Sequence, residues 1–209
     1  MDGGVEGDDY AADVLVDGAG NIIICGTSEV SASNFNAVVV KYNSSGTLQW
    51  ASSFARGANL HDGFVSLERD NSNNIYVCGA TLTTTEFSNY LIVKYNSSGT
   101  QQWASAYDYN DLNDTSVKLV ITSTYILESG GTQVNATDWQ MTSVKYHPCT
   151  GAQGSVLHKG GDGEGIDEVK DVWTDGTYTY VVGGVNNVGW VNNMVMGFDW
   201  KLMKLNSDL

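Results

Sequence analysis

The chain contains little proline, little cysteine and few charged side chains. Its 209 residues include one proline, three cysteines and 16% charged residues. The cysteine count is odd and no Cys-x-x-Cys pair occurs, which argues against a disulfide framework and against a zinc site. Even the longest apolar runs are short, such as that of residues 22–25. We therefore expect no insertion into a membrane.

Basic residues are the scarcest of the charged types. There are 24 acidic residues against 10 basic ones, which gives a net charge of −14. Such a field repels phosphate backbones and anionic lipid surfaces, so we expect no nucleic-acid partner. The acidic excess serves solubility, or it attracts cations such as Ca²⁺ to acidic loops.

The chain does contain an internal repeat. Residues 41–47 recur unchanged as residues 94–100, and a Gln-Trp-Ala-Ser sequence follows in both copies. Two more divergent copies follow, so the unit occurs four times. A glycine marks the same point of each copy: Gly26, Gly79, Gly130 and Gly183.

Each repeat predicts four short strands. In the first copy we expect them at residues 12–17, 22–25, 36–42 and 48–52, separated by turns rich in Gly, Asn and Ser. Units of about 50 residues with four strands each are typical of the β-propeller, because one sheet cannot cover both of its own faces. The sequence therefore predicts an all-β fold in which residues 1–209 form one propeller segment. We expect its blades at 8–58, 61–110, 112–160 and 163–209, with first strands near Val14, Val65, Val117 and Val169.

The first two copies also resemble a known repeat family. Residues 7–14, 17–27 and 38–46, followed by Trp50, are similar to the SBBP repeat, a bacterial seven-bladed β-propeller repeat. The second copy matches from Asp62 to Trp103, whereas the third has Ser155 in place of this tryptophan. The resemblance implies secreted or surface-attached bacterial proteins, and it implies no catalytic residues.

The fourth copy stops at the turn before its outer strand, so we expect the last blade to lack that strand. We therefore favour a piece of a propeller with about six to eight blades. A dimer of two half-rings is the second choice, and a closed four-bladed ring is conceivable. The partners would be the remaining blades or a second copy of the chain, because open blade faces and unpaired edges promote association.

Several recurrent or exposed residues are candidates for a site. The aspartates that open each copy could bind a cation near one mouth of the channel, or could accept backbone N–H groups between blades. We favour the second, structural role. These are Asp9, Asp62, Asp114 and Asp167. Trp50 and Trp103 are expected to pack one blade on the next.

Two loops add further candidates. Asp162, Glu164 and Asp167 belong to an acidic loop that could bind Ca²⁺, although the loop lacks the EF-hand spacing. Trp190, with Asn192 close by, could stack on a sugar ring or grip a protein, or could fold onto its own blade.

The functional hypothesis is a non-enzymatic module of an extracellular or cell-surface bacterial protein. It would serve as a scaffold or as an adhesion and recognition surface for a protein or a glycan, without a cofactor. One alternative is part of a quinoprotein-like propeller enzyme, because residues 46–50, Gly-Thr-Leu-Gln-Trp, are loosely similar to the tryptophan motifs of that class. The other alternative is a Ca²⁺-dependent glycan-binding propeller.

Overall fold

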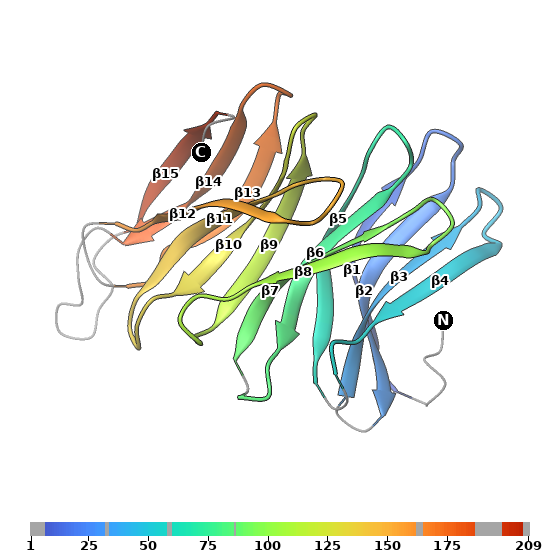
Figure 1. Ribbon diagram of the computed structural model, residues 1–209, viewed down its shortest axis with the longest axis horizontal. Coiled ribbons are helices and arrows are strands. Elements are labelled where there is room, and N and C mark those ends of the chain that lie inside the picture. Colours follow the sequence, from blue (N-terminus) through green and yellow to red (C-terminus); the bar gives the residue numbers. More distant parts are fainter. Residues whose placement is uncertain are drawn as a thin grey trace.

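The chain folds into four antiparallel β-sheets that follow one another in a row. The computed structural model describes residues 7–31, 34–57, 60–85, 87–161, 165–186 and 198–206. These ranges hold fifteen strands and no helix, and hence no helix that could cross a membrane. In Figure 1 the row runs from the first sheet, in blue on the right, to the last sheet, in red on the left.

Each sheet is a meander whose strands are paired in sequence order. Sheet 1 consists of β1 (Asp9–Val16), β2 (Ile22–Ser31), β3 (Asn34–Tyr42) and β4 (Leu48–Phe54). Sheet 2 consists of β5 (Asp62–Arg69), β6 (Ile75–Leu82), β7 (Ser88–Tyr95) and β8 (Gln101–Tyr107). Sheet 3 consists of β9 (Asp114–Ile121), β10 (Ile126–Gln133), β11 (Trp139–Tyr146) and β12 (Gln153–Lys159). Sheet 4 consists of β13 (Glu168–Thr174), β14 (Thr179–Asn186) and β15 (Phe198–Leu205).

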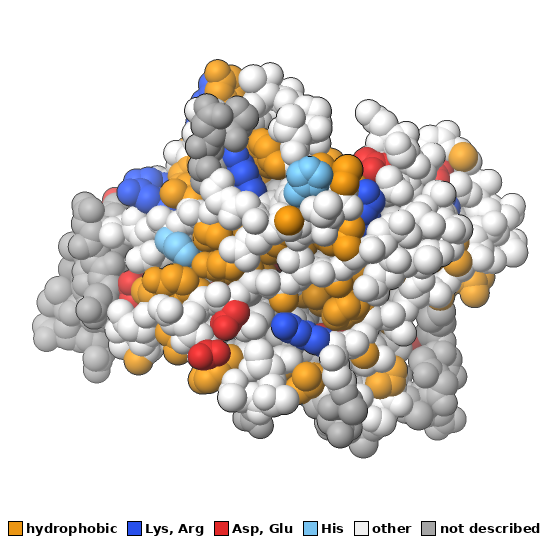
Figure 2. Space-filling view, viewed as in Figure 1, with side chains coloured by type: hydrophobic (Ala, Val, Ile, Leu, Met, Phe, Trp, Pro, Cys, Tyr) orange, Lys and Arg blue, Asp and Glu red, His pale blue; other side chains and the backbone are white. Residues whose placement is uncertain are grey.

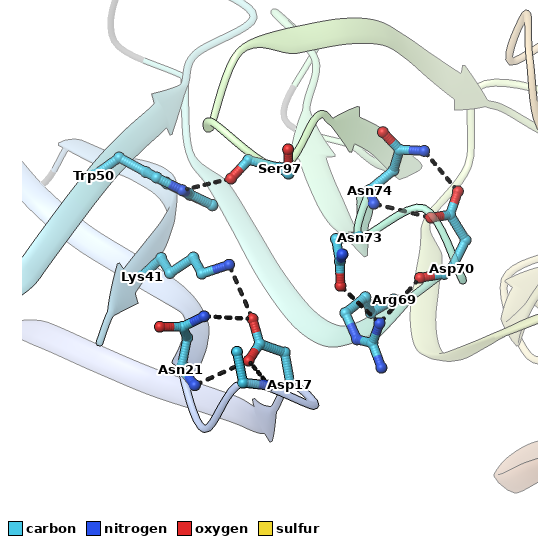
Figure 3. Close-up of polar contacts among 10 residues, drawn as sticks. Asp17, Asn21, Lys41, Trp50, Arg69, Asp70, Asn73, Asn74 and Ser97 are labelled. Atoms are coloured by element: carbon cyan, nitrogen blue, oxygen red, sulfur yellow. Dashed lines mark hydrogen bonds and ion pairs between the residues drawn. The ribbon is translucent and has the colours of Figure 1, made fainter. Parts of the chain in front are cut away.

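The prediction of four consecutive antiparallel sheets is confirmed, and the strands are longer than the sequence indicated. β1 begins at Asp9 and ends before Asp17. The Asp17 side chain closes the turn to β2, because its Oδ1 accepts the N–H groups of Ala19 and Asn21, both at 2.9 Å (Figure 3). An aspartate that accepts two backbone donors in this way stabilises a turn and does not continue a strand.

The recurrent glycine is explained by a β-bulge in the first strand of each sheet. In sheet 2 the register steps from Phe64 to Ser66, so Val65 is an extra residue opposite Gly79. A Cβ atom on Gly79 would lie 1.8 Å from the carbonyl oxygen of Gly63. The other three sheets have the same step opposite Gly26, Gly130 and Gly183. Because the bulged backbone comes this close, a larger residue does not fit.

The hydrophobic core consists of three layers, one between each pair of successive sheets. Side chains of β2 and β3 pack on one face of sheet 2. The opposite face of sheet 2 packs on sheet 3. A third cluster joins sheets 3 and 4. Consequently residues 75–78 of β6 are buried on both faces, whereas residues 22–25 of β2 alternate between half-buried and buried.

The first strands of the sheets lie side by side and form one edge of the row. β1 contacts β5, β5 contacts β9, and β9 contacts β13. The N–H group of Leu67 donates to Asp13 Oδ2 at 3.0 Å, and Lys118 Nζ lies 2.8 Å from Asp171 Oδ1. Among the described residues the row stays open at both ends, so these four sheets do not close a ring.

Candidate functional site

Three of the four recurrent aspartates fasten the links between sheets. Asp62 Oδ2 accepts the N–H group of Arg56 at 3.0 Å, and Asp114 Oδ2 accepts that of Tyr109 at 3.1 Å. Asp167 Oδ2 accepts the N–H group of Gly161 at 2.7 Å. All three side chains are buried, so they hold the backbone of the link and are not presented to a ligand.

Asp9 differs from the other three aspartates because it is exposed at the start of β1. Residues 1–6, which precede it in the chain, lie outside the described residues. Within the described ranges, no three His, Cys, Asp or Glu side chains come together in a way that could hold a metal ion. Asp162, Glu164, Trp190 and Asn192 also lie outside the described residues.

Trp50 and Trp103 lie between sheets, each against a turn of the next sheet. The indole N–H of Trp50 donates to the Ser97 carbonyl at 3.1 Å (Figure 3), and that of Trp103 donates to the Pro148 carbonyl at 3.3 Å. Gly99 and Gly151 lie under the two rings, where an added Cβ would come within 2.6 and 2.5 Å of indole carbons. The same contact thus joins sheet 1 to sheet 2 and sheet 2 to sheet 3.

An open groove runs along the turns that connect the first two strands of sheets 2, 3 and 4. We call it the turn groove. It has a volume of about 640 Å³ and is lined mainly by residues 69–72, 120–123 and 172–174, together with Tyr76, Lys118 and Pro148. Figure 2 shows a notch in the upper edge of the molecule, where Figure 1 places the turns of sheets 2 and 3. The groove was not predicted, because it depends on how three distant turns meet.

Several charged groups of the turn groove contact neighbouring residues. Lys118 pairs with Asp171, and Arg69 Nη1 donates to Asn73 Oδ1 at 2.8 Å. The Tyr76 hydroxyl donates to Asp70 Oδ2 at 3.2 Å. Asn71, Ser72 and Ser123 are exposed in the turns themselves. The groove therefore offers amide and hydroxyl groups to a ligand beside charged side chains, which include Glu68, and beside the exposed Trp173.

A second group of polar residues is buried between sheets 2 and 3. We call Asp114, Ser116, Glu128 and Tyr146 the buried acid cluster. Glu128 is completely buried, and neither carboxylate oxygen makes a hydrogen bond of good geometry. Burial raises the pKa of Glu128 to about 8, although the hydroxyls of Ser116 and Tyr146 act in the opposite direction. Burial also raises the pKa of Asp114 to about 7.

Glu128 was missed by the sequence analysis, although the repeat contains a signal for it. It precedes the recurrent glycine by two positions, where the other copies have Ile24, Val77 and Val181. One acid among three β-branched apolar residues marks an unusual interface between sheets. A buried carboxylic acid with no cation nearby is expected to be protonated at neutral pH.

His158 bridges the same two sheets. Its Nε2 lies 2.9 Å from the Tyr107 hydroxyl, and its Nδ1 lies 2.9 Å from Thr142 Oγ1. Burial lowers the pKa of His158, which favours the neutral ring. A neutral imidazole has one donor and one acceptor nitrogen, so one hydroxyl accepts and the other donates. The contact of Nε2 with Tyr107 joins β8 to sheet 3, and the contact of Nδ1 with Thr142 of β11 holds the ring within sheet 3.

No protein-family model matches the chain, and no curated protein matches it.

Proposed function

We propose that the chain is a non-enzymatic β-propeller module in which the four sheets are successive blades of a ring of about six to eight blades. The repeated joins between sheets support this arrangement. First strands meet along one edge, a tryptophan of one sheet covers a turn of the next, and a core layer fills each interface. The resemblance to the SBBP repeat supports an extracellular or cell-surface location in a bacterial protein.

The turn groove is the observation that carries the functional part of the proposal. It is concave, it opens to solvent, and equivalent turns of three successive sheets line it. Loops on a rigid scaffold are the usual place for recognition. Hydroxyl, amide and charged groups in this lining can hydrogen-bond a ligand rich in hydroxyl groups, and the exposed Trp173 offers an apolar ring face. We therefore propose a scaffold that recognises a glycan through this groove.

Glycan arrays probed with and without a chelator test this proposal. We expect binding that persists in the chelator, because no metal-binding cluster occurs among the residues described around the groove. Ser72→Arg and Ser123→Arg place a long charged side chain in the groove at exposed turn positions. We expect each substitution to reduce binding at least about tenfold, since about 1.4 kcal/mol of lost contact energy suffices for that.

Gln102→Arg is the matched control. It adds the same charge at an exposed position of β8 that does not line the groove, and it should leave binding unchanged. Binding that survives both serine substitutions would place recognition elsewhere on the molecule. Binding that disappears in chelator would favour a Ca²⁺-dependent lectin. If no glycan is bound, the recognition role of the groove is wrong.

A further inference from the structure

The outer face of sheet 1 carries apolar side chains at positions that are covered in every other sheet. Val14 of β1 lies opposite Ile24 of β2. Ile24 precedes the recurrent glycine of this sheet, Gly26, by two positions. Its side chain is 58% exposed. The equivalent residues in sheets 2, 3 and 4 are buried against the preceding sheet: Leu67 at 4%, Leu119 at 0% and Val172 at 2%. A hollow of about 190 Å³ lies on the same outer face, between Ile24, Val38, Val40 and Tyr42.

The outer face of sheet 4 shows the converse pattern. Trp200 of β15 is 84% exposed and lies opposite Gly184 of β14. Gly184 directly follows the recurrent glycine of this sheet, Gly183. The equivalent residues of sheets 1, 2 and 3 are each covered by the following sheet: Ala37, Tyr90 and Met141, all at 0%. Leu202, Val182 and Tyr180 lie on this face as well, and Trp173 packs beside Tyr180 with ring centroids 5.8 Å apart.

These two faces are the two halves of one kind of interface. Three times within the chain, a face of the sheet 4 type packs on a face of the sheet 1 type and forms a core layer. Each half recurs uncovered at one end of the described row. A large exposed apolar patch on a folded chain marks an interaction surface, and the internal interfaces indicate what covers this one.

We infer that the face of sheet 4 in one copy docks on the face of sheet 1 in a second copy of the chain, head to tail. This inference rests on the proposed blade arrangement. Two such contacts would close a two-fold ring of eight sheets, because a head-to-tail contact either closes or continues as a filament. Lys204 provides a further contact of the kind that the internal interfaces contain. Its equivalent Lys94 donates to the Pro148 carbonyl of the following sheet at 3.0 Å, so Lys204 would reach the matching turn of the partner copy.

The charge of the chain sets the conditions for association. Each copy carries −14, so two copies repel at low ionic strength, and salt screens this repulsion. We expect dimerisation to strengthen as salt rises. Cys149 is exposed, so a reductant is needed to prevent disulfide-linked dimers.

Sedimentation velocity on the whole chain tests the docking. We expect twice the monomer mass at high protein concentration. Val14→Glu and Trp200→Glu each place a charge on one face, at a side chain that is exposed in the isolated chain, so folding is preserved. We expect each variant alone to be monomeric. A mixture of the two should dimerise again, because it retains one intact face of each kind.

Val65→Glu is the matched control, since Val65 is a partly exposed bulge residue of β5, and it should dimerise like the wild type. Loss of dimer in only one of the two face variants would indicate a contact between like faces and would contradict the head-to-tail arrangement. A wild type that is monomeric at every concentration overturns the docking, whereas the blade arrangement would still allow further repeats to cover the faces. Filaments would support the docking and contradict ring closure.

Discussion

Glu128 offers the sharpest test of how this fold tolerates charge. The side chain is completely buried between sheets 2 and 3, and burial raises its pKa from 4.5 to about 8. Between these two pH values the unfolded chain has lost the proton while the folded chain retains it. The folded state therefore binds more protons, and its stability falls as pH rises.

The magnitude follows from the width of this pH interval. One pH unit corresponds to about 1.4 kcal/mol for a single group. From pH 4.5 to pH 8 the contribution of Glu128 therefore changes by up to about 5 kcal/mol, which is a large part of the stability of an ordinary domain. The contribution of Glu128 to the free energy of unfolding is most favourable below pH 4.5. This contribution is fully lost above pH 8.

Urea unfolding at several pH values measures this effect. Glu128→Gln keeps the shape and cannot ionise, so the difference in unfolding free energy between wild type and this variant should change by about 1.4 kcal/mol per pH unit. Glu128→Val introduces the valine that the second and fourth copies have at the equivalent position, Val77 and Val181. It should be more stable than the wild type at pH 8, because a buried charge is replaced by packed apolar surface.

Glu168→Gln is the control, because this partly exposed carboxylate pairs with Lys170 at the surface and should leave the slope unchanged. Parallel stability curves for wild type and Glu128→Gln would refute the reasoning. They would mean that the carboxyl is hydrated in the folded state or is ionised at neutral pH.

Three further predictions concern the repeat itself. Gly79→Ala should abolish folding or destabilise by about 3 kcal/mol, because its Cβ would meet the Gly63 carbonyl at 1.8 Å; an unchanged melting temperature would contradict the bulge. Trp103→Ala should cost about 2 to 3 kcal/mol, less than a fully buried tryptophan, and a loss below about 0.5 kcal/mol in urea unfolding would show that the turn contact is unimportant. Hydrogen bonds from Asn21 and Lys41 hold the pKa of Asp17 well below its usual range against the effect of burial. Its contribution is therefore present above about pH 4 and is lost as pH falls towards the folded pKa. Asp17→Asn should flatten this acid dependence in circular dichroism melts, and an identical dependence in both proteins would contradict this prediction.

Part of the candidate site could be anticipated from the sequence. The recurrent aspartates and tryptophans were found because each occupies the same place in successive copies, and this periodicity indicated a role between blades. The turn groove could not be found in this way. Its walls come from turns far apart in the chain, and their separation depends on how the sheets stack.

The sequence by itself determined the all-β class, the four units and the meander within each unit. It did so because strand alternation, turn residues and repeat spacing are local properties. The repeat count also predicted open faces at the two ends, but only the tertiary structure decided which side chains those faces leave exposed. Val14 and Leu67 occupy equivalent positions and are both apolar, yet one is exposed and the other is buried. Burial depends on whether a neighbouring sheet lies across that face, and local sequence does not contain this information.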